Sequence, residues 1–293
     1  MKKSIILFGA LFLCLLTLQA TENNNELNNY EIRTKGRIIS FVEIETNKVT
    51  KTINKVDNNP FMQKIGQKRD AKIGVLDFKL TDINSIDIKQ ERKDLLKYIN
   101  ENMLWVKTVP QIFFTENKKY LVISYNLSFG EINSEGSIFS IAHIFVYNSK
   151  GEQIGEAYFN DRVCGFPVLS ERAEHLGFKF ELPYGQVGRI KTGFAIYDFK
   201  QKKIVVEDFV PKGFDGTYTV ISDNQMMYSI KNSQVYIYVL QDLDLKRTYR
   251  KTFKKEKYFK LMKKNKEGLY FKTDDKEEFE LISFEKDFDI IEW

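Results

Sequence analysis

The stretch Ile138–Phe159, IFSIAHIFVYNSKGEQIGEAYF, indicates the fold most directly. Two runs rich in β-branched and aromatic residues, Ile138–Tyr147 and Gln153–Phe159, enclose the polar tetrapeptide Asn148–Gly151. Asn, Ser and Gly suit the dihedral angles of a tight turn, and bulky flat side chains fill the faces of a pleated sheet. The stretch therefore predicts a β-hairpin.

Similar strand pairs recur along the chain. Upstream, Gln111–Phe114 and Tyr120–Tyr125 flank a polar turn. Downstream, the predicted pairs are Phe194–Phe199 with Lys203–Glu207, Tyr218–Ile221 with Met226–Ile230, Val235–Leu240 running toward Leu245, and Phe279–Phe284 running into Phe288. With 24 Phe and 15 Tyr in the chain, this pattern indicates an all-β protein.

The spacing of the pairs is regular. If Phe145, Tyr197, Tyr238 and Ile282 are equivalent points, the steps are 52, 41 and 44 residues. Four strands in about 40–50 residues is the period of a propeller blade. The rhythm, and the Phe113–Tyr125 hairpin with its short polar turn before Tyr-Leu-Val, resemble the β-propeller repeat superfamily of the WD40-like or TolB-like kind. The resemblance covers residues 110–293 well and residues 30–90 loosely, and no Trp-Asp signature ends a repeat.

This resemblance implies one β-propeller domain over residues 30–293, with about five or six four-stranded blades. Ring closure would pair Arg37–Glu45 with Phe279–Phe284 and so remove open sheet edges. A large β-sandwich, which needs no fixed period, is the alternative. Near residues 88–104 the apolar residues follow helical spacing, which predicts one short inserted helix that packs on the sheet rim, or else binds a partner.

The first twenty residues differ from the rest. Lys2 and Lys3 precede a nearly unbroken apolar run, and a small residue, Ala20, ends it. This pattern predicts a cleaved signal peptide over residues 1–20, a flexible Asn- and Glu-rich leader over residues 21–29, and export to the periplasm or the extracellular space. No transmembrane span is expected after cleavage. Cys14 lies inside the apolar run and not at its end, which argues against a lipoprotein anchor there.

Composition narrows the class of partner. The chain has 293 residues, of which 43% are hydrophobic and 29% charged, as in a globular protein with a core. Its net charge is +5, and without Lys2 and Lys3 it has 43 cations against 40 anions. That balance, together with export, argues against a nucleic-acid partner. A protein or glycan of the cell envelope is expected instead.

Few residues suit catalysis or metal binding. Of the two histidines, His143 is expected as a hydrogen-bonded core residue on the strand face of Phe145, or else in the lining of a central channel, and His175 is expected in a solvated hairpin tip. After signal removal Cys164 is the single cysteine, and a buried structural thiol is expected. The sequence has no zinc motif and no phosphate loop, and turn acidity accounts for Asp242–Asp244 and Asp274–Asp275 better than calcium ligation does. No catalytic residue, cofactor site or metal site is predicted.

One charged stretch, Lys246–Lys266, has eleven cations against Glu256 alone. We predict a possible anion-facing patch here, formed by Lys246, Arg247, Arg250, Lys251, Lys254, Lys255 and Lys257. The alternative is a solvated connection between two blades. Such a patch would adhere to an anionic surface.

The function that fits these observations is an exported, non-catalytic binding or scaffold protein of the bacterial envelope. It would recognise a ligand or partner on one face of the propeller. The alternative is a carbohydrate-active enzyme whose carboxylates, contributed by distant blades, meet at the centre of the ring.

Overall fold

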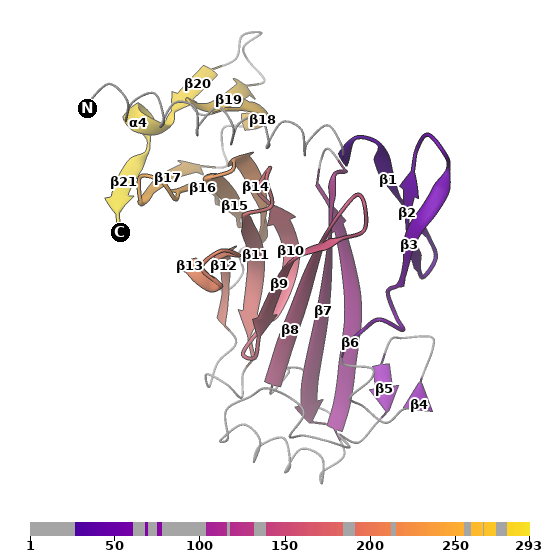
Figure 1. Ribbon diagram of the computed structural model, residues 1–293. Helices are drawn as coiled ribbons and strands as arrows, with labels where there is room; N and C mark the ends of the chain where they lie inside the picture. The colour runs from indigo at the N-terminus through magenta and orange to yellow at the C-terminus, as the bar shows by residue number, and fades with distance from the viewer. Residues whose placement is uncertain are drawn as a thin grey trace, which may run out of the picture.

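The structure of the protein, a computed structural model, describes most of the chain beyond its first 26 residues. The described residues are 27–60, 68–69, 75–77, 104–115, 118–131, 139–183, 191–211, 215–254, 259–265, 267–273 and 280–293. They form an all-β protein with one short helix, α4 (Phe284–Asp287), between its last two strands (Figure 1). The predicted all-β class is confirmed.

The strands form five antiparallel sheets, none of which closes on itself. Sheet A contains β1 (Tyr30–Lys35), β2 (Ile38–Glu43) and β3 (Lys48–Asn54). Sheet B contains β4 (Lys68–Arg69), β5 (Val75–Asp77), β6 (Leu104–Phe114), β7 (Tyr120–Glu131), β8 (Phe139–Asn148) and β9 (Gln153–Phe159). Sheet C contains β10 (Val163–Leu169), β11 (His175–Leu182), β12 (Lys191–Asp198) and β13 (Lys203–Val210). Sheet D contains β14 (Asp215–Ser222), β15 (Gln225–Lys231), β16 (Val235–Asp242), β17 (Arg247–Lys254) and β21 (Asp289–Glu292), and sheet E contains β18 (Phe259–Lys264), β19 (Gly268–Thr273) and β20 (Glu280–Ser283).

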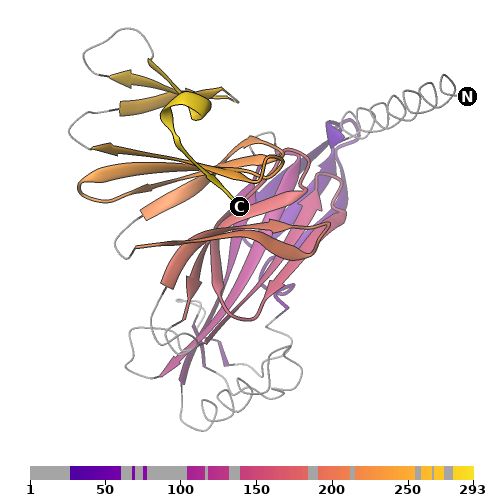
Figure 2. The same cartoon turned by 90° about the vertical axis from the view of Figure 1, so that its left-hand side faces the viewer.

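Sheets B to E lie face to face in the order of the sequence, as Figures 1 and 2 show. Side chains alternate along a strand, so a strand in an inner sheet needs apolar residues on both of its faces. Val239 of β16 packs against sheet C with Phe194, whereas Tyr238 and Leu240 pack toward sheet E. This explains why Val235–Leu240 is apolar throughout.

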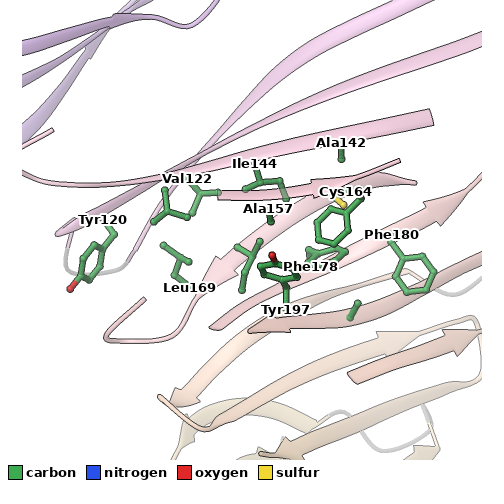
Figure 3. Close-up of a cluster of buried hydrophobic side chains, with 14 of the residues drawn as sticks. Tyr120, Val122, Ala142, Ile144, Ala157, Cys164, Leu169, Phe178, Phe180 and Tyr197 are labelled. Carbon is green, nitrogen blue, oxygen red and sulfur yellow. The ribbon is translucent and has the colours of Figure 1, made fainter. Parts of the chain in front are cut away.

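A core of buried side chains lies between sheets B and C (Figure 3). Sheet B contributes Val122, Ile144 and Ala157, and these pack against Phe178 and Tyr197 of sheet C. All five side chains are buried. Burial of a side chain such as Val122, Ile144 or Phe178 contributes about 1.5–3 kcal/mol, so this interface is a principal source of stability.

Most of the predicted hairpins are confirmed: β6–β7, β8–β9, β12–β13, β14–β15 and β16–β17 pair as expected. The four points taken as equivalent lie on β8, β12, β16 and β20. Each is the third strand of a meander, counted from β6, β10, β14 and β18. The period therefore reflects repeated sheets, and five sheets exceed the two of a β-sandwich.

The strand pairing predicted to close the ring, Arg37–Glu45 with Phe279–Phe284, is wrong. The strand β2, within Arg37–Glu45, is already paired on both sides, with β1 and β3, so it has no free edge for β20. The last predicted hairpin is also wrong. Phe284–Asp287 forms α4, and β21 pairs with β17 of sheet D instead of β20.

Several predictions concern residues outside the described part of the chain. These are the signal peptide, most of the leader, and the helix predicted near residues 88–104, except that Leu104 begins β6. At the end of the predicted leader, Leu27 is buried and its carbonyl accepts a hydrogen bond from the Ser149 hydroxyl at 2.8 Å. Among the described residues, no helix is long and apolar enough to cross a membrane.

Candidate functional site

A cleft of about 590 Å³ lies where β6 of sheet B, β10 of sheet C and β14 of sheet D come together. In the fold, β10 lies against β7 on one side and β14 on the other. The cleft is lined by Phe113, Phe114, Thr115, Lys119, Val122, Pro167, Val168, Leu169, Glu171, Arg172, Tyr218, Thr219, Val220 and Asp223. Its volume falls within the range of small-molecule and peptide-anchor pockets.

The floor of the cleft is apolar and continuous with the core. Val122 and Leu169 are buried in the cluster between sheets B and C, and Phe113 packs against that cluster. The ring of Phe113 also makes an edge contact with Phe166, whose side chain is 54% exposed. An occupant of the floor would therefore meet aromatic and aliphatic surface.

Tyr218 contributes the wall on the side of sheet D. Its ring contacts Phe194 and Tyr228 at centroid distances of 5.4 and 5.6 Å. Its hydroxyl is buried and has no hydrogen-bond partner among the described residues. Burial, and secondarily the charge of Asp208, raise the pKa of Tyr218, so the phenol stays protonated.

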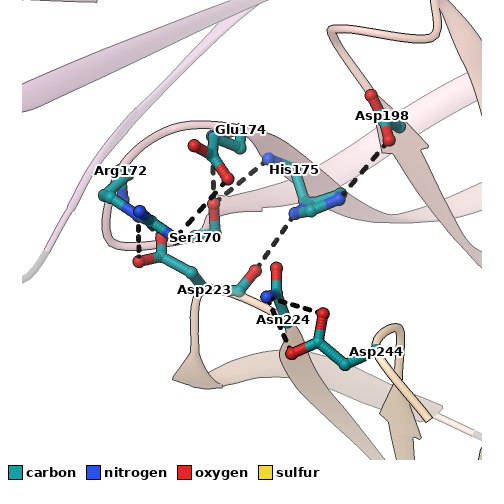
Figure 4. Close-up of polar contacts among 8 residues, drawn as sticks. All are labelled: Ser170, Arg172, Glu174, His175, Asp198, Asp223, Asn224 and Asp244. Atoms are coloured by element: carbon teal, nitrogen blue, oxygen red, sulfur yellow. Dashed lines mark hydrogen bonds and ion pairs between the residues drawn. The ribbon is translucent and has the colours of Figure 1, made fainter. Parts of the chain in front are cut away.

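The rim of the cleft is charged. The Asp223 carboxylate accepts hydrogen bonds from the backbone N–H of Arg172 at 2.6 Å and from its Nε at 2.7 Å (Figure 4). A second carboxylate, Glu174, lies 3.7 Å from the Arg172 guanidinium. Burial, and secondarily the charge of Asp223, raise the pKa of Tyr120 close to this rim. The ion pair thus fixes the turn after β10 against the turn after β14.

His175 lies behind this ion pair, and the prediction that it is solvated is wrong. The residue is only 8% exposed. Its Nδ1 lies 3.0 Å from the Asp223 carbonyl oxygen, which accepts only, so Nδ1 carries the proton (Figure 4). Its Nε2 lies 3.6 Å from the Asp198 carboxylate. The Ser170 hydroxyl accepts a hydrogen bond from the backbone N–H of His175 at 3.1 Å.

The prediction for His143 is met only in part. The residue lies on the same strand face as Phe145, with ring centroids 4.2 Å apart, but it is half-buried and not part of the core. Its Nε2 is 2.6 Å from a Glu156 carboxylate oxygen, a partner that the sequence did not reveal. Glu156 comes from β9, where it sits opposite Phe145. The alternation of side chains along β8 does not predict which residue of β9 lies beside His143.

Cys164 is completely buried, as predicted, and burial raises the pKa of its thiol well above the ordinary value. Its backbone joins sheets B and C. The Asn126 side chain donates to the Cys164 carbonyl and accepts from the Cys164 N–H, both at 2.9 Å. A structural role follows from this geometry.

Among the described residues of the predicted anion-facing patch, Lys246, Arg247, Arg250 and Lys251 do not line the cleft. Arg247 pairs with Glu292 at 2.9 Å, and the Lys251 ammonium donates to the Asp287 carbonyl at 2.5 Å. Lys246 lies in the exposed turn before β17, and Arg250 is exposed on that strand. Lys254 ends β17, and Lys255 and Lys257 lie outside the described residues, so the patch stays a prediction.

The Asp242 and Asp244 carboxylates of the predicted acidic turn accept hydrogen bonds from other groups of the protein. The Asp242 carboxylate accepts from the Leu245 N–H and the Gln225 amide, and the Asp244 carboxylate accepts from the Asn224 amide. In the part of the chain that the structure describes, no three His, Cys, Asp or Glu side chains gather in a way that would hold a metal ion. Asp274 and Asp275 lie outside that part.

Comparisons with known proteins do not name a family. No family model matches the chain, and no curated protein sequence matches it. Among solved structures it is similar to hydrazine synthase of Kuenenia stuttgartiensis, with a TM-score of 0.32 and 10% identity over 80% of this chain and 67% of that one. It is also similar to Hsv2 of Kluyveromyces lactis, with a TM-score of 0.25 and 11% identity over 72% and 77% of the two chains. Likeness at this level bears on neither fold detail nor function.

Proposed function

We propose that the protein is a non-catalytic binding protein and that the cleft between β6, β10 and β14 takes an apolar anchor side chain of a partner protein. The observation that supports this most is the combination of an apolar floor, with Phe113, Val122 and Leu169, and a charged rim at Arg172 and Asp223. Buried aromatic anchors in pockets supply most of the affinity at protein interfaces, and polar rims supply orientation.

The polar groups at the rim support binding over catalysis. Asp223 is occupied by Arg172 through both of its carboxylate oxygens. The other acid of the cleft, Glu171, is exposed. A glycoside hydrolase, the alternative, requires one protonated and one ionised carboxyl on opposite sides of a bound sugar. A carboxylate that accepts two N–H groups serves poorly as the acid of such a pair.

We further infer that the sheets are blades of one β-propeller. The feature that supports this scaffold is the run of three successive four-stranded segments, β6–β9, β10–β13 and β14–β17, with β6, β10 and β14 at the cleft. The cleft would then lie toward the ring axis. We retain export to the periplasm or extracellular space, so that the partner is a component of the cell envelope.

The experiment tests whether a large side chain placed in the cleft prevents binding of a partner. A displayed library of random peptides is selected on the wild-type protein, and the affinity of the selected peptides is measured by fluorescence anisotropy. Thr219 lines the cleft on β14, and Thr219→Trp is expected to lower that affinity about tenfold or more, because the indole occupies the volume of the anchor.

Thr252→Trp is the matched control, since Thr252 is exposed on β17 of the same sheet. It is expected to bind the selected peptides as the wild type does. Equal affinity of the wild type and Thr219→Trp for every selected peptide would contradict the proposal. Hydrolysis of an envelope polysaccharide by the wild type, lost in Asp223→Asn, would favour the enzyme instead.

A further inference from the structure

A second concave surface lies at the opposite edge of the same pair of sheets. Sheet D has β17 and β21 beyond β16, whereas sheet C ends at β13. The edge strand β13 and the outer strands of sheet D face each other at one groove. The groove has a volume of about 380 Å³ and is lined chiefly by β13 and by Gln241, Thr248, Arg250 and Trp293.

Trp293 provides a flat aromatic wall in this groove and is 48% exposed. Its indole Nε1–H donates to the Thr248 hydroxyl at 2.8 Å, and its backbone N–H donates to the Lys246 carbonyl at 3.0 Å. Two hydrogen bonds thus hold the ring in one orientation. A fixed aromatic surface costs little conformational entropy when a ligand packs on it.

Gln241 also lines the groove and provides a hydrogen-bond donor. Its Oε1 accepts a hydrogen bond from the Thr248 hydroxyl at 2.7 Å. Within the described residues, its Nε2 donates to no partner. A ligand oxygen that accepts from this amide would therefore displace no partner inside the protein.

Charged groups of both signs complete the lining. Arg250 is exposed and forms no ion pair among the described residues. On the facing strand β13, Asp208 accepts from the Tyr228 hydroxyl of sheet D. The neighbouring Glu207 side chain points to the other face of sheet C, where it accepts from Arg162 at 2.5 Å. The Asp208 carboxylate can accept further hydrogen bonds, because an ionised carboxyl has about four lone-pair sites.

We propose that this groove binds a saccharide. A sugar ring presents an apolar face, which suits Trp293, and hydroxyl groups that both donate and accept. Those hydroxyls match the Asp208 carboxylate and the donors of Gln241 and Arg250. A purely anionic ligand would be repelled by the Asp208 carboxylate, and a purely apolar one would cover the Asp208 and Arg250 side chains without replacing their hydrogen bonds to water. The groove is separate from the cleft assigned to a partner protein.

The test is titration calorimetry with maltotriose, cellotriose, chitotriose and mannotriose, each at up to about 1 mM, together with quenching of tryptophan fluorescence. At least one sugar is expected to bind the wild type. For that sugar, Trp293→Ala is expected to lower the affinity about tenfold or more, and Trp293→Phe to lower it less, because a smaller ring remains. Gln241→Leu is expected to weaken binding severalfold without change in the thermal unfolding midpoint beyond that of the control.

The matched control is Leu245→Ala, since Leu245 is 54% exposed on the turn between β16 and β17 and does not line the groove. Its affinity for the sugar should equal that of the wild type. No heat or quenching with any of the four sugars would overturn the proposal. So would binding that is unchanged in both Trp293→Phe and Trp293→Ala, two variants whose folding is checked by circular dichroism.

Discussion

Asp198 and His175 show how single ionisable groups connect sheets C and D. Burial alone would raise the pKa of the Asp198 carboxyl, but hydrogen bonds from the Gln201 N–H and side-chain amide, and the charge of His175, outweigh burial. The pKa of Asp198 is therefore lowered. The Nδ1–H of the same His175 ring donates to the Asp223 carbonyl oxygen, and the Asp223 carboxylate binds Arg172. The ionisation of Asp198 is therefore linked to the turn that contains Asp223.

The lowered pKa predicts a pH dependence of stability. The folded pKa of Asp198 lies below the unfolded value of about 3.9, so its stabilisation is present above that pH and is lost as the pH falls through the folded pKa. At neutral pH, Asp198→Asn is expected to lower the free energy of unfolding by about 1–2 kcal/mol. Urea unfolding measured from neutral pH down to about pH 2 should show the two proteins converge in acid.

Asp289→Asn is the control for this experiment, because Asp289 is exposed on β21. Its stability is expected to follow that of the wild type at every pH. A constant gap between wild type and Asp198→Asn at all pH values would contradict the linkage.

At the scale of the element, strand packing depends on glycines where two backbones approach closely. In β12, a Cβ added at Gly193 would lie 2.3 Å from the Asp208 carbonyl oxygen and 2.5 Å from the Phe180 ring. At Gly165 in β10, by contrast, no atom lies within 4 Å of an added Cβ. The two positions therefore differ in the room available for a Cβ atom, although both lie in strands of sheet C.

Gly193→Ala is expected to lower the free energy of unfolding by about 1–3 kcal/mol, because β12 must shift from β13 to admit the methyl group. Gly165→Ala is the matched control and should change it by less than about 0.5 kcal/mol. Chemical denaturation of both variants measures the difference. Equal stability of the two variants would show that sheet C relaxes without cost.

Local elements were predictable from the sequence, and contacts between distant elements were not. The β8–β9 hairpin follows from its own residues, since its strands and turn are contiguous. The pairing of β21 with β17 spans the whole of sheet E, and no local pattern encodes it. The cleft was missed for the same reason, because Phe113, Leu169 and Tyr218 come from three different sheets. His175 was misjudged because its buried partners lie on other turns.

At the scale of the whole molecule, the compartment is the property that the sequence predicts and the fold does not address. Lys2, Lys3 and the apolar run that ends near Ala20 predict removal of residues 1–20 during export. When the full-length chain is expressed in a bacterium that secretes through this route, intact mass spectrometry of the exported protein should give a chain that starts near Thr21.

Lys2→Glu with Lys3→Glu is the comparison variant, since it removes the cationic start and should leave precursor in the cytoplasm. An exported protein that still begins at Met1 would instead indicate a retained anchor.

The return of β21 to sheet D has a consequence for the groove at Trp293. Because β18, β19 and β20 lie between β17 and β21 in the sequence, sheet E is an insertion within sheet D. The edge of β17 at Arg247–Arg250 therefore pairs with a strand that follows the insertion. The groove is complete only when β21, which carries Ile291, has paired with β17, so a ligand in the groove would stabilise that pairing.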